Sequence, residues 1–374
     1  MSNYRPVWAE VDLGAVRDNV RALAAHVAPA RVIVVVKADG YGHGAVPVSW
    51  AALNAGASAL AVALVEEGVA LREAGIDAPV LVLSEPVAEA AETVVHRRLT
   101  PVVYTPSGVE ALAKAASAVG ADAPVAVHLK VDTGMHRVGC RPEDAPDLAR
   151  QICSHPELAL AGTLTHFAVA DEPGRADTAE QLARFARVLA TLRGAGIDPG
   201  TVHTCNTAGA LALGDGRYDA VRVGIGVYGV APAPALAGVV ALRPVLAVKA
   251  RVSFVKHIPA GAGVSYGLRY VAPRDTRLAT VPIGYADGVP RALGERGGEV
   301  LVHGRRCPIA GTVTMDQLMV DVGDLPVQVG DEVVLIGEQG GARVTAAEWA
   351  ERVGTIPYEI VCGIGPRVPR RYRG

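Results

Sequence analysis

Cysteine is scarce in this chain of 374 residues, which contains five cysteines and no Cys-x-x-Cys pair. They are scattered along the sequence as Cys140, Cys153, Cys205, Cys307 and Cys362. An odd number of isolated cysteines argues against a disulfide framework and against a zinc site made of cysteine ligands. The pattern suits a reducing compartment, so we expect a cytoplasmic protein, and no metal site is predicted.

Strong charge and uninterrupted apolar runs are also missing. The formal net charge is −2 with both signs mixed along the chain, which argues against binding to nucleic acid or to an anionic membrane surface. Met1–Asp12 includes charges and a proline but no apolar core, so no signal peptide is expected. Val223–Leu242 is uncharged over about the length of a membrane span, but glycines and prolines interrupt it. We interpret it as a strand followed by a loop.

Strand-like and helix-like patterns alternate through the first 240 residues, beginning with an amphipathic helix that follows Asp12 as its N-cap. The expected apolar strands are Val32–Val36, Ala59–Ala63, Val80–Leu83, Pro101–Tyr104, Val125–Val131, Leu158–Leu164, Thr201–Thr204 and Ala220–Val227. Alanine-rich helical stretches such as Val109–Val119 and Glu180–Arg193 lie between them. Eight such units predict an α/β fold, a (β/α)8 TIM-type barrel over residues 1–240. A doubly wound open sheet competes with it, but no Gly-x-Gly-x-x-Gly follows the first strand.

A β-rich C-terminal domain is predicted over residues 241–374. Its strand-like segments are Val245–Ile258, Leu278–Ile283, Glu299–Ile309, Leu318–Val322 and Glu332–Ile336, with turn signals such as Gly304 and Gly330-Asp331 between them. Ala346–Val353 is the single clear helix of this part. Pro232 and Pro234 mark the expected boundary, and residues 1–11 are a candidate to pair with the second domain.

Lys37 is the most informative single residue. It closes the β-branched run Val32–Val36, which is typical of a strand buried on both faces, and opens the glycine-rich loop 38–44. An ammonium at such a place loses hydration unless something pairs with it or uses it, and a lysine held there suits Schiff-base chemistry. The alternative is a lysine that simply extends to solvent. A phosphate-binding P-loop is rejected because its lysine follows the glycines, whereas Lys37 precedes them.

Further polar residues lie at or near the ends of later barrel strands, where the chemistry of such barrels collects. They are Lys130, Arg137, His166, Asn206, Thr207, Arg222 and Gly224. His166 can equally be a hydrogen-bonded core histidine. Arg222 lies inside an apolar strand and cannot lose its proton, so it needs a partner, either in an active site or in a structural pair with a carboxylate.

The residues around these positions carry a resemblance to the bacterial alanine racemases. The shared blocks are Val36-Lys37-Ala38-Asp39-Gly40-Tyr41-Gly42-His43-Gly44, Asp132-Thr133-Gly134-Met135-His136-Arg137-Val138-Gly139, Thr165-His166-Phe167-Ala168, Val221-Arg222-Val223-Gly224-Ile225, Gly263-Val264-Ser265-Tyr266-Gly267, Pro282-Ile283-Gly284-Tyr285-Ala286-Asp287-Gly288, Met315-Asp316-Gln317 and Pro357-Tyr358-Glu359. Their order and spacing span the whole chain. That family has a barrel followed by a β domain, in agreement with the pattern above.

The resemblance implies a catalytic apparatus that uses pyridoxal 5'-phosphate, held on Lys37 as a covalent aldimine. Lys37 would act as the base on one face of the substrate Cα and Tyr266 as the acid or base on the other. Tyr266 would be connected through His166 to Arg222. Arg222 would face the pyridine nitrogen. At ~4 Å and an effective dielectric constant of ~20, its charge opposes protonation of that nitrogen by ~4 kcal/mol, which favours racemisation over decarboxylation or transamination.

The same resemblance implies the remaining contacts. Phosphate would be bound by Tyr41, Thr207, the backbone N–H groups of Gly224 and Ile225, and Tyr358, with Asn206 beside them. Arg137 and the backbone at Met315 would bind the substrate carboxylate, with Tyr285 near the entrance. Tyr266, Tyr285 and Met315 would come from a partner subunit, so a two-fold homodimer with shared active sites is expected.

Some positions depart from the commonest pattern of that family. Asp39-Gly40 replaces a frequent Asn-Ala, Thr207 replaces serine, and Thr314 replaces cysteine. Lys130 matches a lysine that is carbamylated in some members.

Three functions are compared: an alanine racemase supplying D-alanine for the cell wall, a related barrel enzyme such as a broader racemase (serine) or a decarboxylase, and a non-catalytic pyridoxal-phosphate carrier. Tyr266 lies outside the barrel and argues against the carrier, while the bulk of Tyr358 argues against a wide pocket.

Overall fold

The structure is a computed structural model that describes residues 4–374 and divides into two compact units. The barrel unit contains residues 16–40 and 45–243, and the β unit contains residues 4–15, 41–44 and 244–374. Predictions made above for residues 1–3 lie outside the described residues. Within residues 4–374, no helix is both long enough and apolar enough to cross a membrane.

Eight parallel strands form a closed barrel in chain order, and the last pairs with the first. They are β2 (Arg31–Val35), β3 (Ala59–Val62), β4 (Val80–Val82), β5 (Thr100–Val103), β6 (Val125–Lys130), β7 (Leu158–Leu164), β8 (Thr201–His203) and β9 (Ala220–Val223). The predicted TIM-type barrel is confirmed, and closure by β9 on β2 excludes the doubly wound open sheet. The expected strand Ala220–Val227 was too long, because the backbone leaves the extended conformation at Gly224 and residues Ile225–Tyr228 form a 3₁₀ turn, η2.

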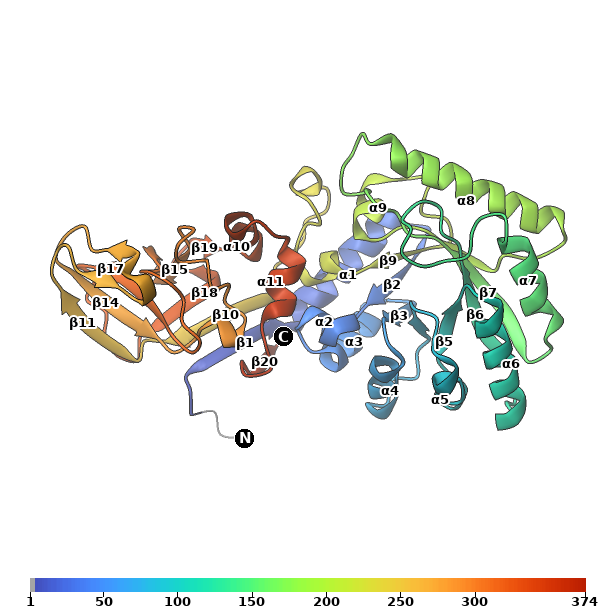
Figure 1. Ribbon diagram of the computed structural model, residues 1–374, viewed down its shortest axis with the longest axis horizontal. Coiled ribbons are helices and arrows are strands. Elements are labelled where there is room, and N and C mark those ends of the chain that lie inside the picture. The colour runs from blue at the N-terminus through green and yellow to red at the C-terminus, as the bar shows by residue number, and fades with distance from the viewer. Residues whose placement is uncertain (1–3) are drawn as a thin grey trace. The chain divides into compact units, whose positions relative to one another are not determined.

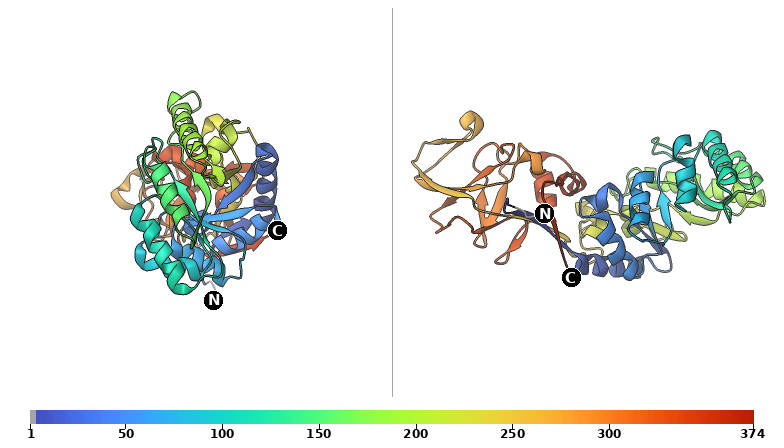
Figure 2. Two further views of the ribbon diagram at one scale, coloured as in Figure 1. Left: turned by 90° about the vertical axis from the view of Figure 1, so that its right-hand side faces the viewer. Right: turned by 90° about the horizontal axis from the view of Figure 1, so that it is seen from below.

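Helix α1 (Leu13–Val27) precedes the first barrel strand, further helices connect successive strands, and η3 (Pro234–Leu236) follows the last strand. The connecting helices are α2 (Lys37–Tyr41), α3 (Ala45–Asn54), α4 (Val65–Glu73), α5 (Ala91–His96), α6 (Pro106–Val119), α7 (Ala145–Ser154), α8 (Ala176–Gly194) and α9 (Thr207–Ala212), with the short turn η1 (Ala88–Ala90). Local sequence explains their ends. For α6, the Thr105 side chain accepts from the Gly108 N–H, Pro106 occupies the first turn and Gly120 ends the helix in the left-handed conformation. Figure 1 shows α4 to α8 outside the strands, and Figure 2 shows the unit from two further directions.

The β unit is built on a seven-stranded sheet of order β16-β15-β18-β10-β1-β20, with β19 paired to β18. The strands of this sheet are β1 (Val7–Asp12), β10 (Leu246–Arg251), β15 (Glu299–Val302), β16 (Arg305–Pro308), β18 (Glu332–Gln339), β19 (Ala342–Val344) and β20 (Arg370–Arg373). A three-stranded sheet contains β11 (Phe254–Ile258), β14 (Thr276–Val281) and β17 (Leu318–Gly323), and a ribbon pairs β12 (Gly263–Val264) with β13 (Tyr270–Val271). The N-terminal β1 pairs antiparallel with β10, from Val7 opposite Ala250 to Val11 opposite Leu246.

Two predictions for the β unit need correction, and one turn signal is confirmed. The segment Val245–Ile258 divides between two sheets, as β10 and β11. Glu299–Ile309 is a hairpin of β15 and β16 that reverses at the predicted turn residue Gly304, where His303 and Gly304 both have positive φ. Ala346–Val353 is observed as α10, but a second helix, α11 (Pro357–Gly363), follows it and carries Tyr358. The 3₁₀ turns η4 (Tyr266–Leu268) and η5 (Tyr285–Asp287) hold two of the predicted site residues.

Candidate active site

Lys37 lies two residues beyond the end of β2 at Val35 and begins an unusual turn. Ala38, Asp39 and Gly40 have φ/ψ values of 51/51°, 51/49° and 62/44°, so the segment labelled α2 is left-handed rather than a normal helix. L residues rarely adopt this conformation, and here two of them do so in succession. The turn is held from outside: Glu67 Oε1 accepts from the Ala38 N–H at 2.6 Å, and Asp39 Oδ1 accepts from the Ala45 N–H at 2.8 Å.

Arg222, on β9, is 3 % exposed and forms five hydrogen bonds, all to neutral acceptors. Its Nη1 donates to His203 Nδ1 at 2.7 Å and to His203 O at 3.0 Å. Its Nη2 donates to Thr165 O at 2.8 Å, to Thr204 O at 2.9 Å and to His166 Nδ1 at 3.2 Å. The structural pair with a carboxylate, considered from the sequence, is therefore not the arrangement found. Burial lowers the pKa of Arg222 to about 10, so the guanidinium remains charged at neutral pH.

Two histidines that were not predicted from the sequence extend this network through the barrel interior. His128 on β6 and His203 on β8 join through a 2.8 Å contact between His128 Nδ1 and His203 Nε2. Because Arg222 can only donate, His203 Nδ1 must accept, so the His203 proton is on Nε2 and is donated to His128. Burial and then the charge of Arg222 lower the pKa of His128 to about 4 and that of His203 well below its ordinary value, so both rings are neutral.

His166 and Lys130 lie at the ends of neighbouring strands among cationic groups. Burial, then the charges of Arg222, Arg137, Lys130 and Lys37, hold the pKa of His166 well below its usual value. Its Nδ1 accepts from Arg222, so the neutral ring carries its proton on Nε2. Lys130 is 6 % exposed; burial first, then the charges of Arg222, Arg137 and Lys37, outweigh Asp132 and lower its pKa to about 8. A small pocket at this point is lined by Lys130, Arg137 and His166, and Arg137 itself is exposed.

The loops after the seventh and eighth barrel strands form a compact cradle. Asn206 caps α9 by accepting from the Gly209 N–H at 2.9 Å, and the Gly224 N–H donates to Thr207 Oγ1 at 3.0 Å. Ile225 is completely buried, and within residues 4–374 its N–H has no hydrogen-bond acceptor. Buried N–H groups are almost always paired, so this one indicates an acceptor supplied from outside the chain. The loops after these two strands are the usual phosphate site of such barrels.

Two further predicted residues come together within the β unit. The rings of Tyr41 and Tyr358 are tilted with centroids 6.2 Å apart. Tyr41 is 8 % exposed and Tyr358 is half-buried. Burial, then Tyr358 and Cys362, raise the pKa of Tyr41, so its hydroxyl keeps its proton and can donate a hydrogen bond.

Tyr266, Tyr285 and Met315 share a structural setting in the β unit, and all three are exposed, at 71 %, 40 % and 53 %. Thr312 Oγ1 donates to Tyr266 O at 3.0 Å, and the Tyr285 N–H donates to Thr314 O at 3.0 Å. The segment 312–315 therefore contacts both turns that carry the tyrosines. Within residues 4–374, the Met315 N–H has no acceptor. Large side chains exposed together in this way are typical of surfaces that meet another molecule.

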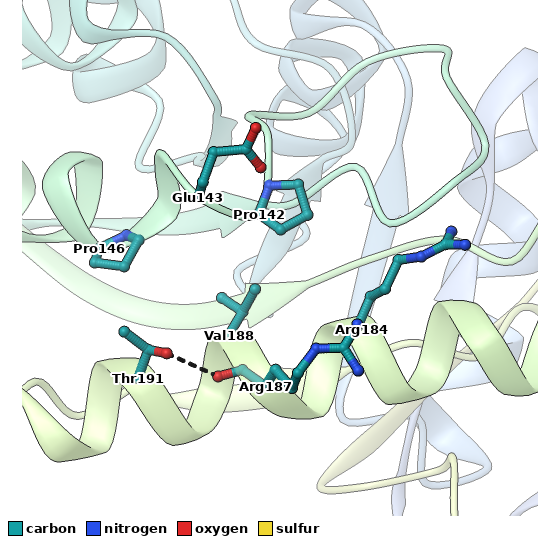
Figure 3. A pocket seen from close by; sticks show the side chains of 7 residues that line it. All are labelled: Pro142, Glu143, Pro146, Arg184, Arg187, Val188 and Thr191. Carbon is teal, nitrogen blue, oxygen red and sulfur yellow. Dashed lines mark hydrogen bonds between the residues drawn. The ribbon is translucent and has the colours of Figure 1, made fainter.

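A larger pocket of about 380 Å³ lies elsewhere in the barrel unit, between α8 and the segment that enters α7 (Figure 3). Figure 3 shows Arg187 and Thr191 on α8, where Thr191 Oγ1 donates to Arg187 O at 3.0 Å. None of the residues predicted for the active site lines it. Among residues 4–374, no group of three or more His, Cys, Asp or Glu side chains is arranged to hold a metal ion.

Comparison with known proteins assigns both units. Residues 11–232 match the family described as "Alanine racemase, N-terminal domain", and residues 245–372 match "Alanine racemase, C-terminal domain". A curated protein named alanine racemase, from Symbiobacterium thermophilum, is 50% identical over 100% of this chain and 99% of its own length.

Solved structures agree with this assignment. An alanine racemase from D-cycloserine-producing Streptomyces lavendulae aligns with a TM-score of 0.94 at 40% identity, covering 100% of this chain and 98% of that one. A histidine racemase from Leuconostoc mesenteroides subsp. sake aligns with a TM-score of 0.91 at 29% identity, covering 100% of this chain and 99% of that one. The matches span both units over their whole length, and this chain belongs to the alanine racemase family.

Proposed function

We propose that this protein is an isomerase that interconverts L-alanine and D-alanine with pyridoxal 5'-phosphate as its cofactor. The observation that carries the proposal is the environment of Arg222. The hydrogen bonds of this guanidinium, which is charged at neutral pH, go only to neutral acceptors, and its charge acts on Lys130 together with that of Lys37. This group can donate to a nitrogen lone pair without transferring a proton to it. Lys37 and Arg222 thus supply an attachment point and a donor at the same end of the barrel.

The residues present fit this cofactor. The N–H of Ile225, which has no acceptor within residues 4–374, and the hydroxyl of Thr207 offer donors for a phosphate after the seventh and eighth strands. The Gly224 N–H already donates to Thr207, so a bound phosphate would share that donor or replace the bond. Tyr41 and Tyr358 would add two phenol hydroxyls. When bound, pyridoxal phosphate supplies a carbonyl that captures the substrate amine and a ring that withdraws electrons from Cα.

The chain's own groups then move the proton. Lys37 takes or returns it on one face of Cα, and Tyr266 does so on the other, because inversion needs one group on each side. Arg137 and the Met315 N–H bind the substrate carboxylate. Neutral His166 presents Nε2–H as a donor that orients the tyrosine. We place Tyr266, Tyr285 and Met315 in the partner's active site within a homodimer, which accounts for their joint exposure.

Lys130 is proposed to be carbamylated. A buried lysine among Arg222, Arg137 and Lys37 is disfavoured as a cation, and its pKa of about 8 leaves part of it as the neutral amine that reacts with CO₂. The reaction forms an N–C bond, releases a proton and turns a positive group into a negative one. The product would pair with Arg137 instead of repelling it.

The exchange of the substrate α-hydrogen in D₂O tests the two-base assignment. Tyr266→Phe should slow exchange far more when it starts from one alanine enantiomer than from the other, because one face alone loses its proton carrier. Tyr270→Phe is the matched control: it lies four residues away in the same ribbon, and its hydroxyl bonds Asp321 instead of facing solvent. An equal loss from both enantiomers in Tyr266→Phe, or no loss, contradicts the assignment. Lys37→Ala should abolish covalent cofactor attachment.

Substrate breadth and cellular role complete the proposal. The histidine racemase with the same fold makes a broader amino-acid racemase the second candidate, and chiral chromatography with serine and histidine separates the two. A non-catalytic carrier is disfavoured because residues 245–372 match the family's C-terminal domain. We place the enzyme in the cytoplasm, where D-alanine would be used for peptidoglycan.

A further inference from the structure

Glu67, on α4, binds three backbone N–H groups from two separate segments. Its Oε2 accepts from Ala63 at 2.8 Å and from Leu64 at 3.1 Å, at the start of its own helix. Its Oε1 accepts from Ala38 at 2.6 Å. A glutamate at the third position of a helix commonly caps that helix, so the bonds of Oε2 need no further explanation. The bond of Oε1 is different, because it reaches across to the residue that follows Lys37.

The turn that Glu67 contacts is one that the sequence does not favour by itself. Ala38 and Asp39 adopt left-handed backbone angles, which side chains with a Cβ disfavour. Such a conformation persists only where the surroundings hold it. The Glu67 carboxylate supplies a short, charge-assisted hydrogen bond at the first left-handed residue, and Asp39 supplies a second bond at the far side of the turn, to Ala45.

We propose that Glu67 is a positioning residue for Lys37, and this rests on the role proposed above for that lysine. The carboxylate fixes the peptide between Lys37 and Ala38 and thereby fixes the direction in which the lysine leaves β2. Without it, the turn relaxes toward ordinary backbone angles and the ammonium no longer has a single position. Glu67 does not touch the substrate or the cofactor in this account. It acts by pre-organising the attachment point.

Three variants separate the helix cap from the link to Ala38. Glu67→Ala removes both. Glu67→Asp is shorter by one methylene, so it can still cap α4 but cannot also reach Ala38. Glu66→Ala is the matched control, because Glu66 is the neighbouring exposed residue on the same helix and makes no bond to the turn.

The main readout is independent of turnover. The purified protein without cofactor is mixed with pyridoxal phosphate, sampled over time, reduced with borohydride and digested, and labelling of each lysine is measured by mass spectrometry. The exposed Lys114 and Lys256 serve as internal references. We expect labelling at Lys37 to slow roughly 10-fold or more in Glu67→Ala and in Glu67→Asp, with Lys114 unchanged and Glu66→Ala like the wild type. Hydrogen exchange at the Ala38 amide should accelerate in the same two variants.

The outcomes distinguish the possibilities. If Glu67→Asp labels Lys37 at the wild-type rate with a protected Ala38 amide, Glu67 only caps α4 and the proposal is overturned. If Glu67→Ala does not fold, the folded Glu67→Asp decides alone. Slow labelling in a protein that never racemises alanine would support Glu67 while rejecting the proposed function, so the two claims fail separately.

Discussion

Lys130 offers a prediction that depends directly on the charges around it. Its pKa of about 8 lies well below the ~10.4 of a free lysine, because burial and then Arg222, Arg137 and Lys37 oppose the ammonium. At pH 7.5 roughly a quarter of Lys130 is therefore neutral, against about 0.1 % of an ordinary lysine. Since CO₂ reacts with the neutral amine, carbamate formation at Lys130 should exceed that at an exposed lysine by about 200-fold near this pH.

The assay is ¹³C NMR of protein incubated with ¹³C-bicarbonate. The wild type should show a carbamate signal that is absent in Lys130→Met, and the signal should grow as the pH rises from 6.5 to 8.5. Removing the repulsion of one neighbour with Arg137→Gln raises the pKa of the free amine and also removes a partner of the carbamate, so the signal should fall. A signal with a midpoint near pH 10, or one that survives in Lys130→Met, would refute the reasoning.

The same shift has a consequence for stability. The folded-state pKa of Lys130 is lowered, so the unfolded chain binds more protons between about pH 8 and pH 10.4, and stability contributed by this group rises across that window. Below pH 8 the full cost of burying the ammonium is present, about 3 kcal/mol from the size of the shift. In CO₂-free buffer at pH 7, Lys130→Met should therefore unfold at higher urea concentration than the wild type. Equal midpoints in the two proteins would contradict the shift.

Other substitutions give equally direct tests. Arg222→Lys keeps the charge but has three donors where the arginine makes five hydrogen bonds, so at least two acceptors lose their partner. Each lost partner should lower the free energy of unfolding by about 1–3 kcal/mol, measured by urea unfolding, and an unchanged urea midpoint would contradict the network. Asp287→Asn removes a fully buried carboxylate that pairs with Arg5 and Arg367. Because both arginines are partly exposed, the free energy of unfolding should fall by about 3 kcal/mol. An unchanged free energy of unfolding in the Asn variant would refute this prediction. Thr207→Val should weaken cofactor binding about 10-fold, and Thr207→Ser should restore it, as measured by absorbance titration. A valine variant with normal affinity for the cofactor would argue against the phosphate site.

The barrel was predictable because buried parallel strands leave a clear record in sequence. Runs such as Val32–Val36 are apolar throughout, and an arginine or lysine that interrupts or ends one is conspicuous. Arg222 and Lys37 were found for that reason. His128 and His203 were not, because a histidine inside a strand has no local signal that distinguishes packing from a hydrogen-bonded chain. Their significance depends on contacts between strands, because His128 and His203 are 75 residues apart in sequence and His203 also accepts from Arg222 on the next strand.

Other features depended on backbone geometry that composition does not specify. The left-handed turn at Ala38 and Asp39 uses residues that do not favour it, and the contact from Glu67 that holds it comes from a separate helix. The helix Pro357–Gly363 is short and was missed, although a proline at its first position was a usable signal. The roles given to Tyr266, Tyr285 and Met315 rest on the family resemblance, and the structure adds that they share one contacting segment and are exposed.

The proposed reaction equalises the amounts of the two alanine enantiomers. Purified protein would be incubated with pyridoxal phosphate and pure D-alanine, and separately with pure L-alanine, and the enantiomer ratio followed by chiral chromatography. Because the two enantiomers have equal free energy in water, both incubations should converge on an equal mixture. A yellow, cofactor-loaded protein that leaves both enantiomers unchanged would contradict it.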